Sequence, residues 1–328
     1  MRKIKIGLIG TGHLGKIHLR LLLEIPTFEV VGFYDISDVA SKQISDEFGV
    51  TSFPSADDLI AACDAIDIVT PTLFHYHDAV KVLRMQKHLF VEKPITSDSE
   101  EARALQTLAL EARVKIQVGH VERFNPAFLA ASQLELKPMF IETHRLAEFN
   151  PRGTDVPVIL DLMIHDLDII LHIVKAKVKK ISASGVAVVS DTPDIANARI
   201  EFDNGCIANL TASRISMKNM RKTRLFQKDG YIAIDFLNKQ IEVLSMSEVV
   251  GKPGPLDMIL DLGDDRPAKK IQFNAPTVHP SNAIKMELEK FAESILNDTP
   301  TAVTLDDGLN ALVLAEMIVE KVEKNMVI

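Results

Sequence analysis

Short apolar runs alternate with helical patterns through the first 120 residues of the chain. The helical patterns repeat apolar residues every three or four positions, whereas the runs between them are short and continuous. Strands are predicted at Ile4–Ile9, Glu29–Tyr34, Ala65–Thr70, Lys87–Val91 and Lys115–Val118, and helices at His13–Glu24, Val39–Phe48, His75–Met85 and Ser99–Ala112. This alternation predicts an α/β domain, residues 1–120, with a doubly wound parallel sheet that is covered by helices on both faces.

After Gly119 the pattern changes, and residues 139–273 read mostly as strands joined by tight turns. Turns are predicted at Asp203-Asn204-Gly205 and Asp229-Gly230, and helices at Val158–Val174, near Ala283–Leu296 and near Asp306–Asn325. We therefore expect a second, α+β domain, residues 121–328, built on an open and largely antiparallel sheet.

A large sheet with helices on one face leaves its other face in need of cover. A second copy of the chain is a natural source of that cover. We therefore expect a homodimer or homotetramer that assembles through the C-terminal sheet.

Composition narrows the function classes. The net charge of −8 and the pI of about 5.7 argue against a general nucleic-acid binder. No apolar stretch reaches the roughly 18 residues of a membrane span, so we expect no membrane partner. Cys63 and Cys206 fall in different predicted domains without a CxxC spacing, which favours a reducing compartment and a cytoplasmic protein.

A glycine motif, Gly10-Thr11-Gly12-His13-Leu14-Gly15, follows the first predicted strand and opens the first helix. Gly10 permits a tight turn, Gly12 lets the backbone approach a pyrophosphate, and Gly15 allows the helix to pack closely on the strand. The motif alone is a weak signal, and a plain tight turn is the alternative. Its context is stronger because Asp35 ends the second strand 20 residues after Gly15, where an acid binds the ribose of a dinucleotide. We therefore predict a Rossmann domain.

Asp35 also bears on the identity of the cofactor. A carboxylate accepts hydrogen bonds from the ribose 2′-hydroxyl but repels a 2′-phosphate. The next residues, Ile36-Ser37-Asp38, offer no arginine to reverse that preference. NAD is therefore favoured over NADP.

Polar residues and prolines meet where two neighbouring strands end. Glu92-Lys93-Pro94 follows one strand, and Thr70-Pro71, with His75 just beyond, follows the other. Open α/β sheets bind ligands at the carboxyl ends of their strands. Lys93 could be a plain surface lysine paired with Glu92, but Pro94 stiffens the turn that presents it. We predict that Lys93 acts on a substrate.

A second group of polar residues interrupts the apolar helix predicted at 158–174. Asp161, His165 and Asp168 are spaced i, i+4 and i+7, so they share one face of a regular helix. His165 has a suitable pKa to exchange a proton with a hydroxyl, and a carboxylate can orient it. A satisfied core histidine is the bland alternative. Companion ligands for a metal are not apparent, so we expect no metal.

These motifs, in this order, resemble the glucose–fructose oxidoreductase/inositol dehydrogenase/MocA family along nearly the full chain. The matching segments are GTGHLG, Thr70–His75, Glu92-Lys93-Pro94 and Asp161–His165. The resemblance implies that hydride moves between NAD(P) and a carbon bearing a hydroxyl, usually on a sugar or cyclitol. It also implies that Lys93 polarises the oxygen, His165 carries the proton and Asp161 orients the substrate or the lysine. Cofactor contacts are expected from Gly10, Thr11, Gly12, His13, Leu14, Gly15, Asp35, Thr70, Pro71, His75 and Glu92.

Two segments, 118–126 and 160–166, are similar to the branch of UDP-N-acetylglucosamine 3-dehydrogenases. This similarity implies oxidation of the C3 hydroxyl of a UDP-sugar to a ketone. Six basic residues between Arg214 and Lys228 are candidates to hold a diphosphate, although a solvated hairpin is an equal alternative for any one of them. An NAD-dependent dehydrogenase of a free sugar or cyclitol is the second hypothesis, and a non-catalytic NAD-linked regulator is the third. Substrate contacts are expected from Lys93, Arg123, Asn125, Arg145, Asp161, His165 and Arg214.

Overall fold

The chain folds into two compact units. The computed structural model describes residues 3–150, 156–263 and 266–325. The first unit contains residues 1–124 and 282–316, and the second contains residues 125–281 and 317–328. The division expected from the sequence, at residue 120, assigned 282–316 to the second domain, whereas the chain returns to the first unit there.

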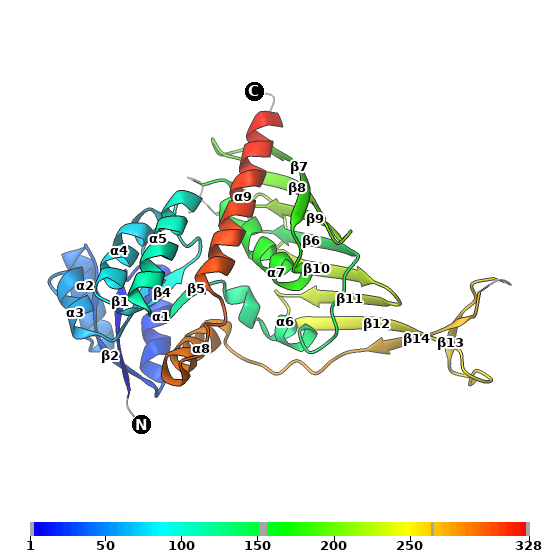
Figure 1. Cartoon of the computed structure of the whole chain (residues 1–328), viewed down its shortest axis with the longest axis horizontal. Helices are drawn as coiled ribbons and strands as arrows, with labels where there is room; N and C mark the ends of the chain where they lie inside the picture. The colour runs from blue at the N-terminus through cyan, green and yellow to red at the C-terminus, as the bar shows by residue number, and fades with distance from the viewer. Residues whose placement is uncertain (1–2, 151–155, 264–265, 326–328) are drawn as a thin grey trace. The chain divides into compact units, whose positions relative to one another are not determined.

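The first unit is built on a parallel sheet of five strands in the order β2-β1-β3-β4-β5 (Figure 1). Its strands are β1 (Ile4–Ile9), β2 (Phe28–Tyr34), β3 (Ala65–Ile68), β4 (His88–Glu92) and β5 (Ile116–Gly119). Each connection between parallel strands needs a crossover, and helices supply it. The helices of this unit are α1 (His13–Glu24), α2 (Asp38–Phe48), α3 (Ala56–Ala62), α4 (Thr72–Arg84), α5 (Ser99–Ala112), α8 (Ala283–Asn297) and the first part of α9 (Leu305–Asn325). The predicted Rossmann-like domain is confirmed.

Helix α8 belongs to the core of the first unit although it lies far along the chain from the strands. Phe291 is fully buried and meets the ring of Phe90 on β4 edge-on, with 5.9 Å between the ring centres. Leu288 and Ala292 join the same apolar cluster. Helix α8 contacts α1, so these two helices cover one face of the sheet while α4 and α5 pack together.

The second unit is built on nine strands in the order β13-β14-β12-β11-β10-β6-β9-β8-β7. All neighbours are antiparallel except β6 and β9, which run parallel. The strands are β6 (Phe140–Leu146), β7 (Val178–Val186), β8 (Ile195–Phe202), β9 (Ile207–Ser213), β10 (Met220–Gln227), β11 (Gly230–Asp235), β12 (Gln240–Glu248), β13 (Met258–Leu260) and β14 (Lys269–Asn274). The predicted open and largely antiparallel sheet is confirmed.

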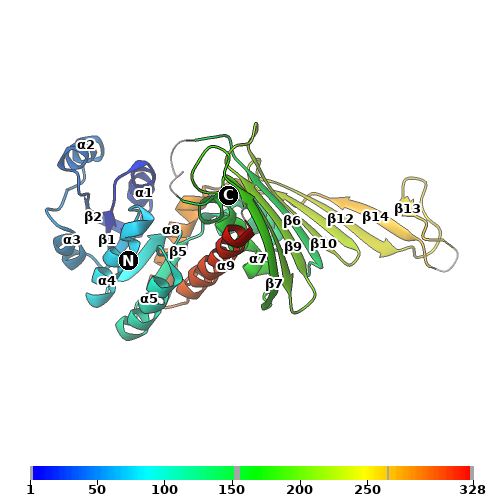
Figure 2. The ribbon, with the colours of Figure 1, turned by 90° about the horizontal axis from the view of Figure 1, so that it is seen from above.

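Helices cover one face of this sheet. Helix α6 (Pro126–Ala131) contacts β11 and β12, and a π-helical turn (Ile159–Met163) contacts β9. This turn leads into α7 (Ile164–Val174), which lies beside the sheet (Figure 2). Side chains alternate accordingly: Ala198 and Ile200 of β8 are buried, whereas Arg199 between them is not. The other face of the sheet carries no helix among the described residues of this unit.

Local signals explain the helix boundaries. Asp98 caps α5, as its position predicts, by accepting a hydrogen bond from the N–H of Glu101 at 2.9 Å. Helix α3 was not predicted from the sequence. Ser55 caps it through the N–H of Asp58, so the Ser-x-x-Asp spacing at 55–58 was the available signal.

No helix within the described ranges 3–150, 156–263 and 266–325 is both long and apolar enough to cross a membrane.

The role of α8 in the first unit can be tested by truncating its central phenylalanine. Phe291→Ala removes a fully buried ring and should lower the free energy of unfolding by about 3–5 kcal/mol. Phe273→Ala on β14, where the ring is 66% exposed, is the control and should change it by less than about 0.5 kcal/mol. Chemical denaturation followed by circular dichroism measures both. Equal effects of the two substitutions would contradict the assignment of α8 to this core.

Candidate functional site

The glycine loop between β1 and α1 brings backbone close to backbone and leaves one side open. Gly10 has φ +93°, a left-handed conformation that favours glycine. A Cβ atom at Gly15 would lie 2.1 Å from the carbonyl oxygen of Gly10, so only glycine lets α1 pack this closely on the loop. A Cβ at Gly12 would meet no described atom within 4 Å. Gly12 also stands at the N-cap of α1 without a side chain to bond the first N–H groups, as pyrophosphate binding requires.

Asp35 stands at the end of β2 and is fixed by three hydrogen bonds. Its carboxylate accepts from the N–H and hydroxyl of Thr11, at 2.8 and 2.7 Å, and from the N–H of Ser37 at 3.0 Å. Partial burial would raise the pKa of Asp35, but these hydrogen bonds outweigh it and hold the pKa below its usual value. An ionised and immobile carboxylate beside the glycine loop fits a ribose diol.

His75 ties together the two loops that follow β3 and β4. Its ring nitrogens lie 2.8 Å from the carbonyl oxygens of Thr70 and Pro94, and the side chain is buried. A Cβ at Gly10 would lie 2.9 Å from Thr70, so the Thr70-Pro71 loop also adjoins the glycine loop. His75 therefore holds the two loops together. Its predicted contact with the cofactor stays a prediction.

Glu92 is the last residue of β4 and Lys93 follows it directly, and the Lys93–Pro94 peptide bond is cis. The Glu92 carboxylate accepts a hydrogen bond from the N–H of Lys93 at 3.2 Å and lies 3.3 Å from the ring of His18. It is turned into the protein, whereas Lys93 is only half-buried. The cofactor contact predicted for Glu92 stays a prediction, and the structure gives this carboxylate a different set of neighbours.

Asp161 and His165 lie on one continuous helical segment of the second unit. Asp161 is in the π-helical turn and His165 is in the first turn of α7, and both are half-buried. Asp168, by contrast, is almost fully buried. The predicted spacing assumed a regular α-helix. Because the segment starts as a π-helix, a feature common at functional sites, the three residues do not form one uniform polar stripe.

Helix α7 is fastened to the sheet by a buried ion pair. Arg145 on β6 donates two hydrogen bonds of 2.9 Å to the two carboxylate oxygens of Asp166. Both side chains are nearly inaccessible to solvent. A bidentate pair fixes orientation as well as position, so it holds the neighbouring His165 on the helix-covered face of the sheet.

Two other residues that were predicted to contact the substrate, Asn125 and Arg123, also have protein partners. Asn125 caps α6 through the N–H of Ala127 and donates to the carbonyl oxygen of Phe236 at 3.0 Å. In the first unit, Arg123 lies 3.4 Å from the Asp307 carboxylate. These contacts show that both residues shape the structure around them, while their contact with a substrate stays a prediction.

Arg214 is buried at the end of β9. It donates to the carbonyl oxygen of Val156, and its Nε atom lies 3.9 Å from the Asp194 carboxylate. Burial would raise the pKa of Asp194, but hydrogen bonds from residues 188–190 lower it to about 2. Arg214 therefore supports a loop in this structure, and its role in binding a diphosphate stays a prediction.

The basic residues between 214 and 228 do not form a single cluster. Lys222 and Arg224 point to the helix-free face of the sheet, where they pair with Asp235 and Glu142. Arg221 lies opposite Arg145 in the strand register and thus shares the face that carries α7. Strand alternation therefore separates residues that are close in sequence.

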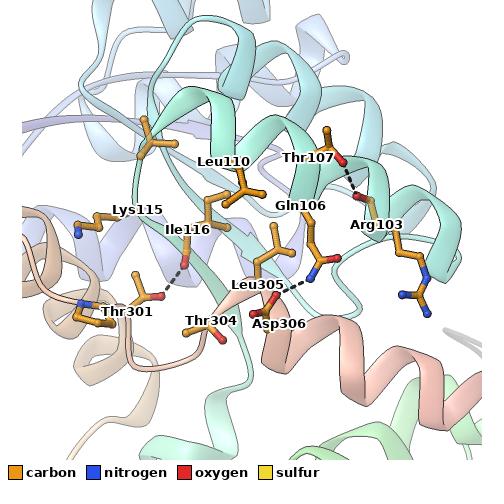
Figure 3. A pocket seen from close by; sticks show the side chains of 13 residues that line it. Arg103, Gln106, Thr107, Leu110, Lys115, Ile116, Thr301, Thr304, Leu305 and Asp306 are labelled. Carbon is orange, nitrogen blue, oxygen red and sulfur yellow. Dashed lines mark hydrogen bonds between the residues drawn. The ribbon is translucent and has the colours of Figure 1, made fainter.

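The first unit also has a cavity of about 730 Å³ at the amino end of β5. Figure 3 shows that its side chains come from α5, from β5 and the residues just before it, and from the start of α9 and the loop that precedes it. In that loop Thr301 donates to the carbonyl oxygen of Ile116 at 2.6 Å. The glycine loop and Lys93 follow the carboxyl ends of their strands. This cavity is therefore separate from the predicted cofactor site.

Sequence reasoning missed three buried residues that adjoin Glu92: His18, Asp67 and Glu287. The charged residue inside the apolar run Ala65-Ile66-Asp67-Ile68-Val69 was the available signal for Asp67. Nothing in the pattern of α8 distinguished Glu287 from a surface glutamate.

Comparisons with known proteins agree with this geometry. The chain matches the GFO/IDH/MocA oxidoreductase family with its NAD-binding Rossmann fold over residues 4–120. It matches the C-terminal domain of the same family over residues 142–233. The expectation of NAD as the cofactor is thereby confirmed.

Similar individual proteins include two sugar or cyclitol dehydrogenases. The chain is 38% identical over 285 residues to the UDP-N-acetylglucosamine 3-dehydrogenase of Acidithiobacillus ferrooxidans, which covers 85% of this chain and 90% of that protein. It is 27% identical over 332 residues to the scyllo-inositol 2-dehydrogenase (NAD(+)) of Bacillus subtilis, covering 94% and 91%. A solved structure of the A. ferrooxidans enzyme superposes with a TM-score of 0.89 at 33% identity over 99% of each chain. The chain therefore belongs to the glucose–fructose oxidoreductase/inositol dehydrogenase/MocA family of NAD-binding oxidoreductases.

Proposed function

We propose that this protein oxidises the C3 hydroxyl of UDP-N-acetylglucosamine, or of a closely related UDP-sugar, to a ketone. The observation that carries the proposal is the 38% identity to a UDP-N-acetylglucosamine 3-dehydrogenase over 85% of the chain. The inositol dehydrogenases are related at lower identity, 27% or less. This order of similarity favours the nucleotide sugar over a free cyclitol.

Each motif residue receives a role in this proposal. NAD⁺, when bound at the glycine loop and Asp35, supplies the acceptor for the hydride that leaves the sugar carbon. Lys93 polarises the oxygen at that carbon, His165 accepts the hydroxyl proton, and Asp161 orients the substrate or the lysine. The assignments rest on the sequence motifs and on the half-buried position of each side chain.

Fewer basic residues are candidates for diphosphate binding than the sequence suggested. Lys222 and Arg224 are engaged on the helix-free face of the sheet. Arg221 shares the other face with Arg145, so it joins Arg214 as the candidate for a phosphate contact. A dehydrogenase of a free sugar or cyclitol remains the second hypothesis, and it needs no such contact.

We also propose a cytoplasmic location. Cys63 and Cys206 are both free and buried, and burial raises the pKa of their thiols to about 12 and about 11. Such unreactive thiols fit a reducing compartment.

The substrate proposal is tested by following NADH formation with a panel of sugars. UDP-N-acetylglucosamine should be oxidised with a kcat/KM at least about 100-fold above that of free N-acetylglucosamine or inositol, because remote binding energy contributes to catalysis. UDP-glucuronic acid and UDP-glucose serve as comparisons for the sugar. Turnover of free inositol or free sugars with no turnover of any UDP-sugar would establish the second hypothesis instead.

Substitution of the catalytic lysine separates chemistry from cofactor binding. Lys93→Ala should lower kcat by about 100- to 10,000-fold because the substrate oxygen loses its polarising cation. The affinity for NADH, measured by fluorescence titration, should stay within about threefold because the glycine loop is untouched. Lys81→Ala on the surface of α4 is the control and should keep full activity. Equal activity in the Lys93→Ala and Lys81→Ala variants would remove Lys93 from the mechanism.

We further propose that a second copy of the chain covers the helix-free face of the second sheet. Phe140, Phe226 and Tyr231 lie on neighbouring strands of this face, with ring centres 6.0 and 5.1 Å apart. Phe226→Glu places a charge among these rings and should shift the protein to monomer in sedimentation velocity. Glu242→Gln on the same sheet is a control that keeps the apolar surface. A wild-type protein that sediments as a monomer would exclude this assembly.

A further inference from the structure

Four ionisable side chains meet inside the first unit beneath Lys93. They are His18 of α1, Asp67 of β3, Glu92 of β4 and Glu287 of α8. His18, Asp67 and Glu287 are fully buried, and Glu92 is 8% exposed. Charged groups are rarely placed in such surroundings unless partners compensate for the lost water. We call these four residues the buried charge cluster.

His18 lies between two of the carboxylates. Its Nδ1 atom is 2.9 Å from Asp67, and its Nε2 atom is 3.3 Å from Glu92 in a contact poorly directed for a hydrogen bond. An imidazole can offer a proton to both sides only when both nitrogens carry hydrogen. Burial would lower the pKa of His18, but the two carboxylates outweigh it and raise the pKa well above its ordinary value. This shift favours a protonated His18 between the carboxyl groups of Glu92 and of Asp67, although burial also raises the pKa of Asp67.

Glu287 approaches the same place from α8 without a partner of its own. Neither carboxylate oxygen has a hydrogen-bond partner among the described residues. Donor atoms of His18, Glu92 and Glu287 all lie within 4.8 Å of one another. Burial and the nearby charge of Glu92 raise the pKa of Glu287 well above its ordinary value. One cation cannot compensate three carboxylates, and Glu287 is the candidate to keep its proton because, unlike Asp67, it has no hydrogen bond to stabilise a charge.

The cluster ends at the backbone of the proposed catalytic lysine. Glu92 accepts the N–H of Lys93, and its other oxygen packs against Gly119 so closely that a Cβ there would lie 2.7 Å away. Burial would raise the pKa of Glu92, but His18 and Lys93 lower it. The groups that face this carboxylate are therefore His18 from α1, Asp67 from β3, Glu287 from α8 and Lys93 from its own strand.

We propose that His18, Asp67 and Glu287 are positioning residues for Lys93. In this arrangement His18 is doubly protonated between Asp67 and Glu92, and Glu287 is protonated. Together they hold Glu92 ionised and fixed against the backbone of Lys93. This inference rests on the proposed function for the role of Lys93. The protonation of the cluster itself stands independently of any substrate.

A metal ion is the competing explanation for one histidine and two glutamates in proximity. The candidate ligand atoms of the three residues lie within 4.8 Å of one another, and the 3.3 Å between His18 Nε2 and Glu92 is a spacing that a tetrahedral zinc site also has. Metal ligands must also be deprotonated, which Glu287 resists. Elemental analysis of the purified protein decides between a proton and a metal.

The protonation of Glu287 is tested by stability as a function of pH. A glutamate in the unfolded chain ionises near pH 4.3, while the folded protein keeps the proton, so wild-type stability decreases as pH rises from there to the raised pKa. Glu287→Gln removes this dependence. The folding equilibrium constant of the variant relative to wild type should therefore increase with pH, by up to about tenfold per unit. The thermal midpoints of the variant and of wild type are compared at pH 5 and again at pH 8 to measure this change.

Glu289→Gln on the same helix is the matched control. The difference in its thermal midpoint from that of wild type should not increase with pH. If the thermal midpoint of Glu287→Gln relative to wild type stays constant or falls as pH rises, Glu287 is ionised in the folded protein and the proposal is overturned. So would one equivalent of metal in the wild-type protein that is lost in Glu287→Gln.

The link to Lys93 is tested by a pH profile. Asp67→Asn keeps an oxygen for the Nδ1–H of His18 but removes the charge that stabilises the imidazolium. Without the Asp67 charge the pKa of His18 falls, so kcat/KM should gain a limb that decreases with rising pH and that the wild-type profile lacks. The exposed Asp57→Asn on α3 is the control and should keep the wild-type profile. A uniform loss at every pH in Asp67→Asn indicates a merely structural role and would overturn the positioning.

The two experiments also separate this inference from the proposed function. If the wild-type protein oxidises no UDP-sugar, the proposed function fails while the stability measurement still reports the protonation of Glu287. If the UDP-sugar is oxidised and the Glu287→Gln difference does not depend on pH, the cluster proposal fails alone.

Discussion

The close packing of α1 against the loop after β1 is the constraint on which the first unit depends. It exists because Gly15 has no Cβ atom to meet the carbonyl oxygen of Gly10, 2.1 Å from where that atom would lie. The same approach brings the next turn of α1, with His18, to Asp67 and Glu92 within the sheet. A glycine motif usually discussed for its contact with a pyrophosphate therefore also sets the charges beneath Lys93.

Much of the fold could be predicted from the sequence where local signals and hydrophobic periodicity agree. The bounds of β1, α1 and α5 match their predictions to the residue, and the predicted turn at 203–205 joins β8 to β9. Tertiary partnership was not predictable in this way. The apolar stripe of α8 indicates that it is buried, but only the packing of Phe291 on Phe90 shows in which unit.

In the candidate site, too, local features could be predicted from the sequence and tertiary contacts could not. Motifs predict roles for Gly10–Gly15, Asp35 and Lys93 because the proposed chemistry depends on residue type and local spacing. They could not show that Arg145 is engaged by Asp166, or that Lys222 and Arg224 face away from α7. A count of nearby basic residues ignores the alternation of a strand, which sends neighbours to opposite faces.

The return of the chain to its first unit has a consequence for biosynthesis. The segment that supplies Glu287 and Phe291 leaves the ribosome only after the whole nine-stranded sheet has been made, because residues 125–281 are inserted between the two parts of the first unit. At 5–20 residues per second, roughly 8–30 s separate residue 124 from residue 282. During that interval the nascent cofactor domain exposes the faces of Phe90 and His18 that α8 later covers. We therefore expect chaperone binding to be most useful at this stage of synthesis.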